Sequence, residues 1–294
     1  MPPTSTMTDQ PDQLLRLALP KGHMQEGVFA LLRDAGIEVR VGARGYRPTI
    51  SIPGVETKLL KPQNIVEMLD QGSRDIGFAG ADWVAELNAD LVQLIDTGLD
   101  PIRLQAAAPV ELAEQGWPDR PVIVASEYER LTRVWMAAQP FDGRFVRSYG
   151  ATEVFPPEDA DCIVDNSATG ATFEANNLRV VGELMRSSTR LYANRRALEI
   201  PQKRRAIEDL VLLLGSVIEA RRRVVIEVNV PAARLDEMVA ALPCMRFPTV
   251  SKLADDGFAV KVAAPREDLP SLIPRIRELG GTDIIVTRPA QIVP

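Results

Sequence analysis

The stretch from Asp161 to Leu178, DCIVDNSATGATFEANNL, constrains the fold most strongly. Its first residues, Asp161 to Val164, predict a short buried strand that ends at Asp165. Seven small or polar residues, Asn166 to Thr172, follow, and a helix is expected to open at Phe173. A strand, a tight turn of small residues and a helix in this order are common in α/β proteins.

The turn after Asp165 has the chemistry to bind an anion. Several backbone N–H groups can point at one spot there, where the helix dipole also favours negative charge. Thr169 and Thr172 add hydroxyl donors, and Gly170 lets the chain approach a ligand closely. Asp165 can accept hydrogen bonds from sugar hydroxyls, so the turn suits a ribose 5-phosphate. An ordinary strand–turn–helix connection with a good N-cap remains the alternative at this point.

The length, charge and residue counts of the chain exclude several kinds of function. A chain of 294 residues can form two or three domains, and a net charge of −6 argues against general binding of nucleic acid or membrane surfaces. His23 is the only histidine, which leaves too few groups for a histidine zinc site or a catalytic triad. Cys162 and Cys244 lack metal-site spacing and are expected to be buried. Residues 1–14 predict a disordered lead-in without a signal peptide, so a cytoplasmic location is expected.

Two turns in the first part of the chain also join a strand to a helix. A strand over residues 15–19 leads through Lys21 and Gly22 into an amphipathic helix. A buried strand leads through Gly80 to Asp82, which is expected to cap the next helix. The carboxyl ends of strands in an open α/β sheet face the ligand crevice, so both turns are candidate cleft walls.

Further segments complete the expected organisation. Strands are expected at 91–97 and 102–107, with a break at Asp100-Pro101, and also at 122–126 and 282–287. A single long helix is expected over 195–222, because its apolar residues share one face. Residues 224–294 read as βαββαβ, the ferredoxin-like order. Arg44 and Arg47 lie in a loop from which they could reach substrate phosphates, although loop arginines are usually solvated.

Several motifs together resemble one family. Asp-x-x-x-Asp-x-x-x-Thr-Gly-x-Thr followed by x-x-x-Asn-x-Leu, beginning at Asp161, resembles the phosphoribosyl pyrophosphate loop of the ATP phosphoribosyltransferases. Leu-Pro-Lys-Gly near the N-terminus, Asp-hydrophobic-Gly-x-x-Gly-x-Asp at Asp75 and Leu-Ala-Asp-Asp-Gly near the C-terminus extend the resemblance from about Leu15 to the end. Many members carry an arginine where this chain has His23, which makes a cationic role at that position doubtful.

The resemblance implies an α/β fold with a bilobal catalytic part, like the class II periplasmic binding proteins, and a C-terminal ferredoxin-like βαββαβ regulatory domain. The implied boundaries are a lead-in at 1–14, lobe I at 15–108 with 179–200, lobe II at 109–178, a linking helix at 201–223 and the regulatory domain at 224–294.

The implied reaction is the first step of histidine biosynthesis, in which N1 of ATP displaces pyrophosphate from phosphoribosyl pyrophosphate. N1 already carries a lone pair, so no nucleophilic side chain is needed, and Mg²⁺ would be held mainly by pyrophosphate oxygens rather than by protein side chains. L-Histidine is the implied feedback inhibitor. The family's long form shifts between homo-oligomeric dimers and hexamers, and neither nucleic acid nor a membrane is an expected partner.

The implied site residues fall into three sets. For phosphoribosyl pyrophosphate and catalysis they are Asp165, Ser167, Ala168, Thr169, Gly170, Ala171, Thr172, Lys21 and Glu153. For ATP or the cleft they are Gly22, Arg44, Arg47, Gly80, Asp82 and Gly150. For histidine they are Glu227, Asn229, Thr249 and Leu253.

Two other functions use the same features. A non-catalytic bilobal binding protein would explain the cleft glycines, but it does not require a loop shaped for a phosphosugar. A phosphoribosyltransferase acting on a free base usually carries paired acidic residues in this loop, whereas here Asn166 follows Asp165.

Overall fold

The structure is a computed structural model that describes residues 14–42, 45–245 and 247–293. The described residues form two compact units, the first within 1–30 and 38–207 and the second within 31–37 and 208–294. Nearly all of the expected lead-in, and the candidate Arg44, lie outside the described residues.

The first unit alternates strands and helices. Its strands are β1 (Leu15–Pro20), β2 (Val39–Arg40), β3 (Thr49–Ile50), β4 (Val55–Leu60), β5 (Ile76–Gly80), β6 (Leu91–Pro109), β7 (Val122–Ser126), β8 (Gly143–Arg147), β9 (Cys162–Ser167) and β10 (Leu178–Asn194). Its helices are α1 (His23–Asp34), α2 (Pro62–Asp70), α3 (Ala81–Glu86), α4 (Val110–Gln115), α5 (Glu129–Ala137), the short 3₁₀ turn η1 (Thr152–Val154), α6 (Ala171–Ala175), α7 (Arg195–Glu199) and α8 (Pro201–Arg222). Helices α1 and α8 begin in the first unit and end in the second.

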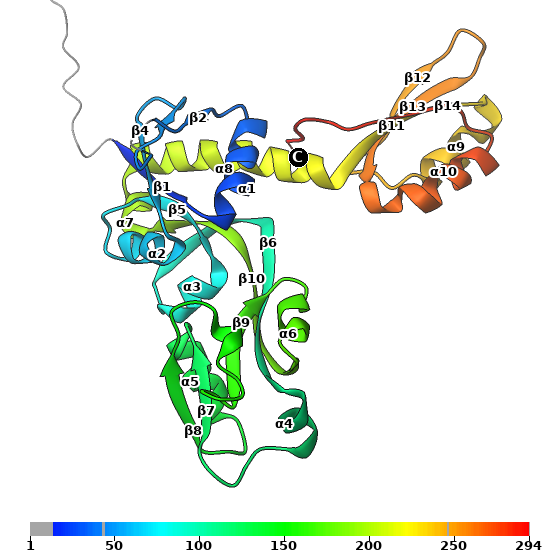
Figure 1. Ribbon diagram of the computed structural model, residues 1–294. Helices are drawn as coiled ribbons and strands as arrows, with labels where there is room; N and C mark the ends of the chain where they lie inside the picture. Colours follow the sequence, from blue (N-terminus) through cyan, green and yellow to red (C-terminus); the bar gives the residue numbers. More distant parts are fainter. Residues whose placement is uncertain (1–13, 43–44, 246, 294) are drawn as a thin grey trace, which may run out of the picture. The chain divides into compact units, whose positions relative to one another are not determined.

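Eight strands form one sheet in the order β4-β1-β5-β10-β6-β9-β7-β8. Strands β4, β1 and β5 form lobe I, strands β9, β7 and β8 form lobe II, and the long antiparallel pair β6 and β10 belongs to both (Figure 1). The α/β fold class and the two lobes are therefore confirmed, and the two crossings between the lobes are single long strands.

The expected break at Asp100-Pro101 is wrong. Strand β6 continues through both residues, and its register with β10 shifts between Ser187 and Thr189. Asp100 adopts a positive φ of 46°, so the pair forms a local irregularity rather than an end of the strand. Such bulges accommodate a proline, which has no N–H to donate to the ladder.

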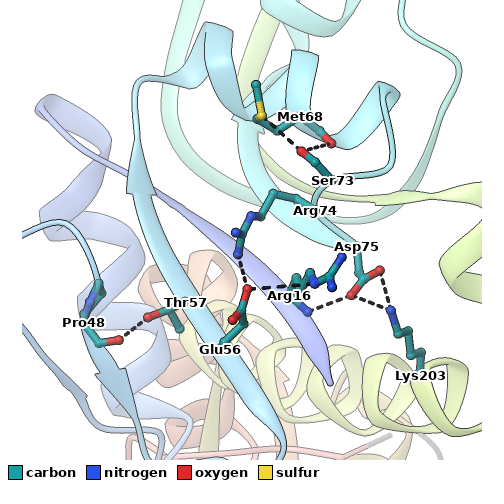
Figure 2. Close-up of polar contacts among 9 residues, drawn as sticks. All are labelled: Arg16, Pro48, Glu56, Thr57, Met68, Ser73, Arg74, Asp75 and Lys203. Atoms are coloured by element: carbon teal, nitrogen blue, oxygen red, sulfur yellow. Dashed lines mark hydrogen bonds and ion pairs between the residues drawn. The ribbon is translucent and has the colours of Figure 1, made fainter. Parts of the chain in front are cut away.

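The expected single helix over 195–222 is also corrected. Helix α7 ends at Glu199, Ile200 is extended with ψ of 112°, and α8 begins at Pro201. A residue before proline is disfavoured in the helical region, whereas proline fits the first turn of a helix. The new helix places Lys203 against Asp75, with its Nζ 2.8 and 2.9 Å from the two carboxylate oxygens (Figure 2).

The second unit contains a four-stranded antiparallel sheet. Its elements are β11 (Arg223–Val230), η2 (Ala232–Arg234), α9 (Leu235–Ala241), β12 (Thr249–Lys252), β13 (Phe258–Pro265), η3 (Arg266–Asp268), α10 (Leu269–Glu278) and β14 (Thr282–Thr287). The sheet order is β12-β13-β11-β14, and the chain order is the predicted βαββαβ. Alternate residues of β11, from Val224 to Val230, are buried against Met238 of α9 and Ile276 of α10.

Candidate active site

A cavity of about 270 Å³ lies within the first unit, where several strand ends of lobe I meet lobe II. Three predicted cleft residues, Lys21, Gly80 and Asp82, contribute to its wall. The other lining residues are His23, Met24, Pro62, Trp83, Asp100, Ile102, Tyr128, Asn166, Ser187, Ser188 and Thr189. The carboxyl ends of β1 and β5 therefore open on one cavity, as expected for an open α/β sheet.

Asp82 does not cap helix α3 with its side chain, contrary to the prediction. Gly80 occupies the N-cap position, and no side chain caps the helix. The Asp82 carboxylate instead accepts hydrogen bonds from the hydroxyls of Ser187, at 2.6 Å, and Tyr128, at 2.7 Å. A Cβ atom at Gly80 would collide with the Asp82 carboxylate, so the glycine leaves room for this arrangement.

Tyr128 and Asn166 continue the network into lobe II. The Nδ2 atom of Asn166 donates to the Tyr128 hydroxyl over 3.1 Å, while that hydroxyl donates to Asp82. Burial, followed by the charge of Asp82, raises the pKa of Tyr128 well above its ordinary value. The phenol therefore stays protonated and acts as a hydrogen-bond donor to the carboxylate.

Asp165 lies inside strand β9 rather than at its end. The strand continues to Ser167, and Asp165 pairs with Gln105 of β6. Its side chain accepts the N–H of Asn166 at 2.7 Å. Burial, together with the charges of Glu153 and Glu127, raises the pKa of Asp165 to about 6. Glu127 was not among the predicted residues.

The predicted phosphate loop is shorter than expected. It spans residues 168–170, and α6 begins at Ala171 instead of Phe173. Gly170 has a φ of +85°, which a residue with a side chain adopts only with strain. The Ser167 hydroxyl accepts the Gly170 N–H at 2.7 Å, and so the buried serine shapes the loop from within. Ala168, Thr169 and Thr172 are exposed.

Lys21 and Gly22 form the turn between β1 and α1. The Lys21 N–H donates to the Leu60 carbonyl, and its exposed ammonium group lies 5.1 Å from the centre of the Tyr46 ring. Gly22 has a φ of +87°. The His23 side chain, 92% exposed, lies 3.6 Å from Asp100.

Like Gly22, Asp165 and residues 167–172, the remaining candidates lie outside the cavity wall. Arg47 is exposed in the loop before β3. Gly150, with φ +104°, precedes the 3₁₀ turn that carries the half-buried Glu153. Glu153 is thus not in a regular helix, but its charge acts on Asp165.

The four predicted histidine contacts do not line one cavity. Asn229 and Leu253 line a cavity of about 380 Å³, and Thr249 lines another of about 410 Å³. Glu227 pairs with Lys261 at 2.7 Å, so its charge is already compensated.

In the described parts of the chain, the His, Cys, Asp and Glu side chains form no group of three or more that could hold a metal ion. No helix in those parts is both long and apolar enough to cross a membrane. Cys162 is buried, as predicted, whereas Cys244 is only partly so.

Sequence reasoning missed Tyr128, Asn166 and Ser187 as cavity residues. Tyr128 could have been found, because it follows the carboxyl end of β7 as Lys21 follows β1. Ser187 lies in the middle of the long strand β10, and no local pattern marks it.

Comparisons with known proteins identify the family. The family model HisG, ATP phosphoribosyltransferase, matches residues 61–216, and the model of the HisG C-terminal domain matches residues 220–288. An ATP phosphoribosyltransferase from Pelotomaculum thermopropionicum is 36% identical over 95% of this chain and 99% of its own length. One from Prosthecochloris aestuarii is 36% identical over 92% and 95%.

A solved structure agrees with these sequence relatives. The ATP phosphoribosyl transferase (HisG:HisZ) complex from Thermotoga maritima contains a chain that is 25% identical to this one, with a TM-score of 0.63, and the match covers 70% of this chain and 99% of that chain. This chain therefore belongs to the ATP phosphoribosyltransferase family.

Proposed function

We propose that the protein transfers the phosphoribosyl group of phosphoribosyl pyrophosphate to N1 of ATP, with L-histidine as feedback inhibitor. ATP phosphoribosyltransferases catalyse the first step of histidine biosynthesis. The observation that carries the finer proposal is the cavity in which Lys21 and Asp82 of lobe I face Asn166 of lobe II, beside Asp165. Two substrates that react with each other need such a shared site.

Asp165 and the loop that follows it would bind phosphoribosyl pyrophosphate. The Asp165 carboxylate accepts the 2- and 3-hydroxyls of the ribose. The exposed donors of Ala168, Thr169 and Thr172 bind the 5-phosphate, while Ser167 and Gly170 keep the loop in shape. Ala171 supplies the first N–H of α6, and Glu153 lies close enough to Asp165 to contact the ribose or the adenine amino group.

Lys21 is the cation of the cavity wall that would contact the pyrophosphate or the triphosphate. Arg47 and Arg44 are the remaining candidates for that role. Asp82 would accept a hydrogen bond from the adenine amino group. Gly22, Gly80 and Gly150 leave room for the chain to turn close to the ligands.

In the transfer, the bond from ribose C1 to the pyrophosphate oxygen breaks and a bond from N1 to C1 forms. The leaving pyrophosphate keeps the electron pair, and no proton moves to or from a side chain. The main task of the site is to hold N1 and C1 together and to neutralise the leaving group. Mg²⁺, which would be held mainly by pyrophosphate oxygens, would supply the charge neutralisation that Lys21 alone does not.

Regulation would occur in the second unit, where the candidate contacts for histidine are Asn229 and Leu253, which share one cavity, Thr249, which lines another, and Glu227. These two cavities, of about 380 and 410 Å³, each have room for an amino acid. Phe247, 93% exposed, and Ile285, 55% exposed, support assembly into homo-oligomers, because large exposed apolar side chains often mark interfaces. A cytoplasmic location completes the proposal.

Pyrophosphate release in a mixture of protein, ATP, phosphoribosyl pyrophosphate and Mg²⁺ tests this function. Release is expected only when all components are present, and a chelator is expected to stop it. Free L-histidine added to the same mixture is expected to slow it. Release that does not need ATP, or its absence from the complete mixture, would contradict the proposal. Histidine without effect would contradict only the regulatory part.

A further inference from the structure

Tyr128 lies at the junction of the two lobes and is almost fully buried, with 2% of its surface exposed. Its ring stacks on Trp83 of α3, with ring centres 4.7 Å apart and an angle of 29° between the planes. Its N–H donates to the hydroxyl of Ser126, which in turn donates to the Val164 carbonyl of β9. The tyrosine is therefore fixed by contacts to both lobes.

The helix that follows Tyr128 is fixed to lobe I as well. The buried Glu86 of α3 accepts the N–H groups of Arg130 and Leu131, at 2.9 and 3.0 Å. These N–H groups belong to the first turn of α5, which has no capping side chain of its own. Because its ring and its backbone are both fixed by these contacts, Tyr128 can set the positions of the groups that its hydroxyl binds.

The Tyr128 hydroxyl has one proton, which it donates in a hydrogen bond of 2.7 Å to the Asp82 carboxylate. The hydroxyl oxygen can then only accept from Asn166, whose Nδ2 lies 3.1 Å away. The backbone N–H of Asn166 donates to the carboxylate of Asp165 at 2.7 Å. A continuous chain of hydrogen-bonded groups therefore joins Asp82 in lobe I to Asp165 in lobe II.

We propose that Tyr128 is a positioning residue whose hydroxyl holds Asp82, in the cavity wall, and Asp165, next to the lining residue Asn166, in the relative position needed for transfer. This inference rests on the proposed function, in which Asp82 contacts ATP and Asp165 contacts the ribose. Reacting atoms must approach to about 3 to 3.5 Å, so a small displacement of either carboxylate slows transfer without abolishing the binding of either substrate. The hydroxyl itself touches no reacting atom and takes no proton.

Replacing Tyr128 by phenylalanine removes the hydroxyl and keeps the stacked ring. Thr132→Val is the matched control, because Thr132 lies one turn along α5 and its buried hydroxyl has no hydrogen-bond partner in the described structure. We expect Tyr128→Phe to lower kcat on the order of tenfold or more and to change KM for either substrate less than about threefold. The control is expected to keep both constants. Unchanged kcat in Tyr128→Phe would overturn the proposal.

A double-mutant cycle tests the connection to Asn166. If the hydroxyl acts through Asn166, then Asn166→Ala in the Tyr128→Phe background has a much smaller effect on kcat than Asn166→Ala alone. Thr132→Val combined with Asn166→Ala is expected to be additive. Additivity of Tyr128→Phe and Asn166→Ala would show that the two side chains act separately and would refute the connection.

Amide hydrogen exchange provides a readout that does not depend on turnover. In the protein without substrates, Tyr128→Phe is expected to speed exchange in residues 165–172, whereas Thr132→Val is expected to leave it unchanged. Exchange at the wild-type rate in Tyr128→Phe would overturn the positioning role, whether or not the protein catalyses the proposed phosphoribosyl transfer. Wild-type protein that releases no pyrophosphate but shows the expected exchange would contradict only the proposed function.

Discussion

Two buried carboxylates flank strand β5 along the chain, and their hydrogen-bonding partners differ in charge. Asp75, just before the strand, faces the ammonium group of Lys203 at 2.8 and 2.9 Å and also accepts the Arg16 N–H at 2.8 Å. Asp82, just after the strand, accepts hydrogen bonds only from two hydroxyls in the described structure, those of Ser187 and Tyr128. The first charge is neutralised within the protein, and the second is not.

The difference shows which carboxylate is available for a ligand. Both oxygens of Asp75 already bind a cation, and Lys203 is 6% exposed, so the pair fastens α8 to lobe I (Figure 2). Asp82 lines a cavity, and a buried carboxylate without a cation attracts donors from whatever enters. Asp165 resembles Asp82 in this respect, because its neighbours Glu153 and Glu127 carry the same charge as its own. Asp75 therefore stabilises the fold, whereas Asp82 and the partly buried Asp165 suit substrates.

The largest effect is expected from Lys203→Met, which leaves the Asp75 charge buried without its cation. We expect a loss of about 3 to 5 kcal/mol in the free energy of unfolding, measured by chemical denaturation. Adding Asp75→Asn should recover much of this loss, because the amide oxygen still accepts the Arg16 N–H. A loss below about 1 kcal/mol in Lys203→Met would show that the ion pair with Lys203 does not stabilise the fold, and the contrast between Asp75 and Asp82 would then fail.

Asp165→Asn is expected to have opposite effects on activity and stability. Loss of the acceptor for the ribose hydroxyls should lower kcat/KM for phosphoribosyl pyrophosphate on the order of 100-fold. Removal of an uncompensated, partly buried charge should raise the free energy of unfolding at pH 7, by up to about 1 kcal/mol. Asp161→Asn is the control, because Asp161 pairs with Arg120 and is expected to cost less activity. Equal activity of Asp165→Asn and wild type would remove Asp165 from the site.

The pH dependence of activity follows from the same carboxylate. The pKa of Asp165 is about 6, above the usual 3.8, so the ionised form is the one that folding disfavours. Stability from this group is therefore greatest at low pH and falls as pH rises from about 4 to about 6, after which it is constant. The kcat/KM for phosphoribosyl pyrophosphate should instead rise up to tenfold per pH unit below about 6 and level off above it. A profile that is flat from pH 5 to 7 would contradict this assignment.

Asp82→Asn should have the smallest effect. The amide keeps one acceptor oxygen but turns a donor toward one of the two hydroxyls, and it has no charge to attract the adenine amino group. We expect KM for ATP to rise about tenfold, equivalent to about 1.4 kcal/mol, with little change in KM for phosphoribosyl pyrophosphate. Ser187→Ala, which removes one hydroxyl and keeps the carboxylate, serves as the control. An equal rise in both KM values would place Asp82 outside the ATP wall.

Most individual strands were predictable because they depend on local patterns. The boundaries predicted for β7 and β14 agree with the structure to the residue, because each is an apolar or β-branched run between turn residues. Strand β6 was predicted as two pieces, since a local pattern treats Asp100-Pro101 as a break. Pairing along the full length of β10 overrides that preference by absorbing the pair in a bulge.

The residues of the candidate site also divide into those that a local sequence pattern predicts and those that it does not. Lys21, Gly80 and Asp82 were found because each stands where a strand turns into a helix, a signal present in the sequence itself. The partners of Asp82 were not found, because Ser187 and Tyr128 lie 105 and 46 residues away along the chain. The pairing of β10 with β5 brings Ser187 to Asp82, and the packing of α3 against α5 brings Tyr128 there.

The sequence by itself determined the α/β elements, the family and the positions of the glycines and carboxylates at the turns. These follow from periodicity, backbone preference and short motifs, all of which act over a few residues. The tertiary structure alone decided which buried carboxylate receives a cation. That choice depends on distances between residues far apart in the chain, such as Asp75 and Lys203, and Coulomb energies in a low-dielectric interior change steeply over such short distances.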